Sequence, residues 1–202
     1  MTNIKPKLLE LNYFSYVKAF FNLMKPRVMS LVIFTCAVGL LIAPVKINFE
    51  DAILALLAVA LGSGAAGALN MWYESDLDSI MTRTCLRPIP TGKLTKKQAL
   101  VFGIISSLVS VIALYIFSNL ISAFILAVTI LFYLFVYTIW LKRKTSQNIV
   151  IGGAAGALPP VIGWAIATNG ITLEPIILFL IIFIWTPSHF WALSLYKSED
   201  YR

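Results

Sequence analysis

Six long apolar stretches, separated by short polar segments, limit the possible folds of this sequence more than any other feature. A helix needs about 17–20 apolar residues to cross a bilayer, and the stretches are near or above that length, at residues 28–43, 52–73, 100–117, 120–140, 149–167 and 171–196. Overall, 59% of the residues are hydrophobic and only 12% are charged, unlike a soluble domain. Because backbone polar groups in lipid must be satisfied within the segment, the sequence predicts an all-α, polytopic membrane bundle of six transmembrane helices.

Positive charges divide unequally between the two sides of this predicted bundle. One side receives both termini and the segments 74–99 and 141–148, which together carry 15 of the 16 Lys and Arg residues, while Lys46 lies opposite. Cytoplasmic segments are enriched in Lys and Arg, so the N-terminus is predicted to be cytoplasmic. Residues 1–27 are interpreted as a basic leader and residues 28–202 as the transmembrane domain. The net charge of +7 is thus attributed to topology, and no nucleic-acid partner is expected.

Acidic residues follow the second apolar stretch, where the bias toward positive charge does not explain them. On a helix, Asn70, Glu74 and Asp78 recur every four residues and project from one face, in a column about 12 Å tall. Asp76 would point elsewhere on an uninterrupted helix. Mg²⁺ prefers a few carboxylates together with substrate phosphate oxygens. The column therefore predicts a site for two Mg²⁺ ions, or for one ion and a phosphate.

Basic residues follow in the same loop and in the next cytoplasmic segment. Arg83 and Arg87 come within fifteen residues of Asp78, and cations beside a metal site are suited to binding a diphosphate. Lys142 and Arg143 follow an aromatic stretch that contains Tyr137. Taken alone, this second pair is typical of a topology-determining cluster with interfacial aromatic residues. Taken with the acidic column, it supplies further candidate phosphate ligands.

The only histidine, His189, stands near the end of the sixth stretch, close to Trp185. A lone histidine near a membrane interface is more often structural than a ligand, so both interpretations are kept. Acidic residues follow it, including Asp200. They are predicted to lie on the same side of the membrane as Asp78.

Together these motifs resemble those of the UbiA-type intramembrane prenyltransferases. Asn70-x3-Glu74-x3-Asp78 is similar to the first Asp-rich motif of that family, N-x3-D-x3-D, with Glu74 in place of an aspartate. The resemblance covers about residues 20–202 and is closest to the branch that farnesylates protohaem IX. Its further strings are RPIPTG at 87–92, NIVIGGAAGALPP at 148–160 and WTPSHFW at 185–191.

The resemblance implies transfer of a farnesyl group from farnesyl diphosphate to a vinyl group of haem B, giving haem O, in a bacterial inner membrane. It implies Mg²⁺ as cofactor on the column and the second acidic motif, with Asp76 as a further catalytic residue; the implied ligands are Asn70, Glu74, Asp78 and Asp200. The implied diphosphate-binding residues are Arg83, Arg87, Lys142 and Arg143. The implied haem-binding residues are His189, Trp185 and Tyr137.

The family has roughly nine spans and continues past the position of Arg202, so the chain is expected to be an incomplete copy of the transmembrane domain. Two other functions stay open at this point. The acceptor of the prenyl group could be a phenolic or quinone precursor. The chain could also be an ion-coupled transporter, since such proteins carry intramembrane carboxylates, although these carboxylates lie at an interface and paired broken helices are missing.

Overall fold

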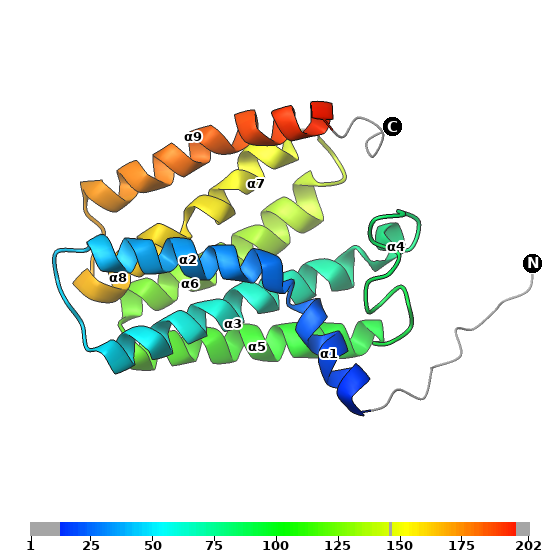
Figure 1. Ribbon diagram of the computed structural model, residues 1–202, viewed down its shortest axis with the longest axis horizontal. Coiled ribbons are helices and arrows are strands. Elements are labelled where there is room, and N and C mark those ends of the chain that lie inside the picture. The colour runs from blue at the N-terminus through cyan, green and yellow to red at the C-terminus, as the bar shows by residue number, and fades with distance from the viewer. Residues whose placement is uncertain (1–12, 146, 197–202) are drawn as a thin grey trace, which may run out of the picture.

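Helices aligned roughly along one axis make up the computed structural model, which describes residues 13–145 and 147–196 (Figure 1). The first half of the chain forms α1 (Tyr13–Leu23), α2 (Pro26–Ile42), α3 (Phe49–Tyr73), the short α4 (Ser75–Asp78) and α5 (Lys96–Phe117). The second half forms α6 (Leu120–Leu131), the π-helical segment η1 (Phe132–Leu141), α7 (Asn148–Ala157), α8 (Pro159–Thr168) and α9 (Leu173–Tyr196).

The predicted membrane spans correspond to these helices. Five are long and apolar enough to cross a bilayer, at Phe49–Tyr73, Lys96–Phe117, Leu120–Leu141, Asn148–Thr168 and Leu173–Leu193. The first predicted span meets the same criterion only when α1 and α2 are taken as one span, bent by 51°. The prediction of an all-helical membrane bundle is therefore confirmed for residues 13–145 and 147–196, with five spans, or six if α1 and α2 form one. The protein is a multi-pass integral membrane protein.

The break between α1 and α2 is built from two adjacent residues. Pro26 occupies the first turn of α2, where its missing N–H costs nothing. A residue that precedes proline is disfavoured in the right-handed helical region, so α1 cannot continue through Lys25. Lys25 instead adopts the left-handed conformation, with φ 53° and ψ 64°.

Two close helix crossings organise the bundle. α3 lies along α5, and α2 lies along α8 (Figure 1). At the second crossing, a Cβ added at Gly163 would lie 1.9 Å from the carbonyl oxygen of Cys36, and one added at Gly39 would lie 2.1 Å from that of Pro160. Because neither position has room for a side chain, the two backbones pack directly against each other. This contact holds α2 and α8 side by side, and both helices contribute residues to the pocket described below.

The fourth span changes from α-helix to π-helix at Phe132. Its hydrogen bonds there run to the fifth preceding residue, as in the bond from the Lys142 N–H to the Tyr137 carbonyl at 3.0 Å. Such segments are rare and often lie at functional sites. This one ends beside α3, with Thr138 fully buried.

Candidate active site

The C-terminal end of α3 and the short α4 that follows it bury three polar side chains. Asn70, Glu74 and Asp78 are at most 3% exposed. Glu74 caps α3, yet the helical spacing continues through it, because its N–H donates to the Asn70 carbonyl at 3.0 Å and the Asp78 N–H donates to the Glu74 carbonyl at 2.8 Å. The three residues therefore lie on the inward face, as their spacing indicates. Asp76 lies on the other face, with 52% of its side chain exposed.

Each acidic side chain of this segment is paired with a basic side chain from a later loop. Lys142 Nζ lies 2.6 Å from Glu74 Oε2. Arg87 Nη1 donates to both carboxylate oxygens of Asp78, at 2.8 and 2.7 Å. Charged groups this deeply buried require such partners. Two residues predicted to bind metal, Glu74 and Asp78, and two predicted to bind diphosphate, Lys142 and Arg87, thus form one cluster.

The third pair is on the surface. Arg143 Nη2 donates to Asp76 Oδ1 at 2.8 Å, and its guanidinium lies 4.8 Å from the centre of the Tyr73 ring. The hydrogen bond from Arg143 holds the pKa of Asp76 below its usual value. Exposed pairs of this kind contribute little to stability. Asp76 and Arg143 therefore lie beside the cluster, outside its buried part.

Asn70 connects the cluster to two residues that the sequence did not indicate. Its side-chain oxygen accepts a hydrogen bond from Lys25 Nζ at 2.5 Å, and its amide nitrogen donates to Thr138 Oγ1 at 3.1 Å. Thr138 in turn donates to the Tyr133 carbonyl at 2.8 Å, within η1. The partners come from 45 and 68 residues away in the chain. Of the two, only Lys25 had a local signal, the Lys-Pro dipeptide at a helix break.

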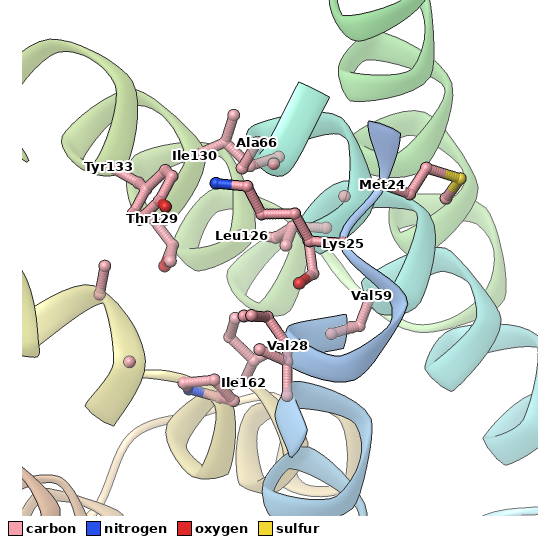
Figure 2. Close-up of a pocket in the computed structure, with 17 residues that line it drawn as sticks. Met24, Lys25, Val28, Val59, Ala66, Leu126, Thr129, Ile130, Tyr133 and Ile162 are labelled. Atoms are coloured by element: carbon pink, nitrogen blue, oxygen red, sulfur yellow. The ribbon is translucent and has the colours of Figure 1, made fainter. Parts of the chain in front are cut away.

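An apolar pocket opens next to Lys25 (Figure 2). It lies between α2, α3, the fourth span and the α7–α8 break, and its lining includes Val28, Val59, Leu126, Ile130, Gly156 and Ile162. Gly156 has no neighbour within 4 Å of an added Cβ, so its surface stays open to the pocket. Lys25 lines this pocket and also hydrogen-bonds to Asn70, so it connects the pocket to the charged cluster.

Comparison with known proteins places the chain in a family. The UbiA prenyltransferase family matches residues 32–202. The chain belongs to this family. Among its relatives are proteins named protoheme IX farnesyltransferase from Pelagibacter ubique, 70% identical over 205 residues, and protoheme IX farnesyltransferase 2 from Mesorhizobium japonicum, 61% identical over 183 residues. The alignments cover 100% and 91% of this chain but 67% and 58% of those relatives. No solved structure matches the chain.

In this UbiA-family chain the remaining predicted site residues lie apart from the buried cluster, except Tyr137, whose ring centre is 5.7 Å from Lys142 Nζ. Arg83 is exposed and forms no ion pair within the described ranges 13–145 and 147–196. His189 and Trp185 are exposed on α9, their rings stacked with centres 4.4 Å apart. Tyr137 packs against Tyr133, with ring centres 5.1 Å apart. Asp200 lies outside the described residues. The end of α9 and α4 are nevertheless at the same end of the bundle (Figure 1).

The oxygen atoms of the UbiA motif fit a magnesium ion that also binds substrate. Asn70, Glu74 and Asp78 offer an amide and two carboxylates, the hard ligands that Mg²⁺ prefers. Among the described residues, no three His, Cys, Asp or Glu side chains gather into a complete metal site. An ion held here would thus depend on other oxygens for the rest of its coordination, as expected for a site shared with a diphosphate.

Proposed function

We propose that this chain forms the diphosphate-binding part of a protohaem IX farnesyltransferase. The reaction transfers the farnesyl group of farnesyl diphosphate to a vinyl carbon of haem B and gives haem O and diphosphate. The names of the relatives support the reaction. The observation that carries the proposal is the buried cluster of Glu74, Asp78, Lys142 and Arg87, which Asn70 and Lys25 connect to an apolar pocket.

The chemistry follows from the charges of the cluster. Asn70, Glu74 and Asp78 would hold Mg²⁺, which supplies positive charge to the diphosphate oxygens when it is bound. Lys142 and Arg87 neutralise the charge that grows on the leaving group. When the allylic C–O bond breaks, its electron pair stays on the diphosphate and the farnesyl carbon becomes a cation. Groups already in place around the leaving oxygens lower the barrier for this step.

The remaining steps consume the cation. The vinyl carbon of haem B attacks it and forms the new C–C bond, and water adds to the resulting haem cation and loses a proton. The product carries a hydroxyethylfarnesyl side chain. The ring faces of Tyr133 and Tyr137, which flank the cluster on η1, would stabilise the allylic cation.

The membrane placement of the site completes the proposal. The chain lies in a bacterial inner membrane with its N-terminus in the cytoplasm. Farnesyl diphosphate therefore reaches the cluster from the cytoplasm, and its hydrocarbon tail enters the apolar pocket within the membrane. The asymmetric distribution of Lys and Arg supports this orientation.

The test is transfer of radiolabelled farnesyl to haem B in membranes that carry the chain and no other haem farnesyltransferase. We expect labelled haem O from the wild type and a loss of about 100-fold in Asp78→Asn, because that carboxylate orients both metal and Arg87. Asp51→Asn, the same change at the opposite end of α3, should retain activity. Label on a phenolic or quinone precursor would assign another acceptor, and unreacted substrate moved across the membrane would indicate a carrier.

A further inference from the structure

Lys25 is a cation at the boundary between the charged cluster and the apolar pocket. Its ammonium donates to Asn70 Oδ1, and its stem lines the pocket. In Figure 2 the side chain extends across the pocket, with its nitrogen on the side of Ile130 and Tyr133. The charges that act on the ammonium are those of Arg87, Lys142, Glu74 and Asp78. Lys25 therefore belongs to the electrostatic environment of the site.

The backbone holds Lys25 in this position at a cost. A left-handed conformation is uncommon for a residue with a side chain, and such strain persists where the surroundings fix it, often at functional sites. Here the surroundings that fix the backbone at Lys25 are provided by α3. A Cβ at Gly64 would lie 2.4 Å from Met24 Cε, and one at Gly67 would lie 3.2 Å from the Met24 carbonyl and 3.5 Å from Lys25 Cγ. Two glycines thus admit the link between α1 and α2 against the helix that ends in the acidic column.

The location of Lys25 matches one part of a prenyl diphosphate. The diphosphate belongs with the cluster and the hydrocarbon tail with the pocket, so the C–O bond that joins them must lie at the boundary. Among the described residues that line the pocket, Lys25 is the only Lys, Arg, Asp or Glu. The other polar side chains of the lining are the neutral hydroxyls of Ser63, Thr129 and Tyr133, of which Thr129 donates to the Ile125 carbonyl at 2.7 Å.

We infer that Lys25 is a catalytic residue that donates a hydrogen bond from its ammonium to the bridging oxygen of the prenyl diphosphate. The inference rests on the proposed function and adds a group to it. As the C–O bond breaks, its electron pair remains on that oxygen, and Lys25 stabilises the new negative charge while keeping its proton. The hydrogen bond to Asn70 orients the ammonium before substrate enters.

The test compares wild type with Lys25→Met, Lys25→Arg and Lys25→Ala in membranes, with Lys18→Met on the exposed side of α1 as control. We expect kcat for farnesyl transfer to fall about 100-fold in Lys25→Met, less in Lys25→Arg, and little in Lys18→Met. The KM for haem B should stay within about twofold, because the ammonium faces the other substrate. Ethylammonium should restore part of the activity of Lys25→Ala, whereas the same concentration of sodium chloride should not.

The outcomes separate this inference from the proposed function. A wild type that binds no magnesium diphosphate and transfers no label removes the proposed function itself. An active wild type with full kcat in Lys25→Met overturns the inference alone, as does a higher KM for haem B at unchanged kcat, which would assign Lys25 to the haem propionates. If Lys25→Met shows no cooperative thermal unfolding, the inference is decided by the activity of Lys25→Ala with ethylammonium. A lysine with a purely structural role would give no recovery of activity with the free amine.

Discussion

At the scale of residues, the site is governed by the pairing of buried charges. Glu74 and Asp78 have side chains only 4% and 5% exposed, and each faces a cation of which about a third or less is exposed. Removing one member leaves a buried charge without a partner, which costs more than the pair itself contributes. We therefore expect Lys142 and Arg87 to stabilise the fold, in addition to the diphosphate-binding role proposed for them.

Lys142→Met tests this dependence. We expect it to lower the free energy of unfolding by about 2 kcal/mol, because Glu74 is left unpaired in a buried position. Lys144→Met, the same change at an exposed position two residues later, should have little effect. Thermal unfolding in detergent measures both. Adding Glu74→Gln should recover most of the loss in Lys142→Met, and failure to do so would show that the two side chains are not coupled.

His189→Ala tests the predicted acceptor contact. His189 is exposed on α9 and stacks on Trp185, at a distance from the buried cluster. We expect the substitution to weaken haem binding, followed by an absorbance titration, while binding of magnesium diphosphate stays within about twofold. An equal loss of both affinities would indicate a folding defect in place of a haem contact.

The acidic column could be predicted at this scale because its spacing of four is a local property of one helix. The partners of the column could not. Lys25 reaches Asn70 from the link between α1 and α2, and Thr138 reaches it from η1, and the residues next to them in the sequence do not specify these contacts. The pairing of Arg87 with Asp78 could not be predicted either. Cytoplasmic loops are rich in Lys and Arg whether or not these residues pair with an acidic side chain.

At the scale of elements, irregular helices position the site. The break at Lys25, the π-helical segment and the break before Pro159 all border the pocket or the cluster. The apolar lengths predicted the spans, and proline explains two of the breaks. The π-helical segment has no comparable signal, since its aromatic and β-branched residues also suit an ordinary helix in lipid.

The crossing of α2 and α8 gives a prediction about packing. Gly163→Ala would place a methyl group against the backbone of α2, and overpacking of this kind costs about 1–3 kcal/mol. We expect a lower unfolding midpoint for Gly163→Ala. Gly156→Ala, which meets no atom within 4 Å, should be neutral or stabilising because alanine favours helix. Equal midpoints for the two variants would contradict the direct backbone contact.

At the scale of the whole molecule, orientation decides which substrates can reach the cluster. α4, the loop that carries Arg87 and the end of α9 lie at one end of the bundle, and the link between α2 and α3 lies at the other (Figure 1). Many large apolar side chains on α5 and α9 are exposed, as expected for helices that face lipid. The bundle therefore presents one charged end to one side of the membrane.

Cysteine labelling tests the orientation. In a chain with Cys36 and Cys85 replaced by serine, Lys46→Cys should react with a membrane-impermeant maleimide in intact cells. Lys144→Cys should react only after the inner membrane is opened, because the cytoplasmic side carries the excess of Lys and Arg. The reverse pattern would invert the proposed topology.

The ion pairs of the cluster have a consequence for the order in which ligands bind. Glu74 is paired with Lys142, and Asp78 with Arg87. A metal ion that binds alone to the carboxylates would leave the Lys142 ammonium and the Arg87 guanidinium without partners. A diphosphate that binds alone to these cations would leave the two carboxylates without partners. Only magnesium and diphosphate together give each carboxylate and each cation of the cluster a new partner of opposite charge. Magnesium and diphosphate should therefore show strong positive cooperativity, each raising the affinity of the other by the same factor.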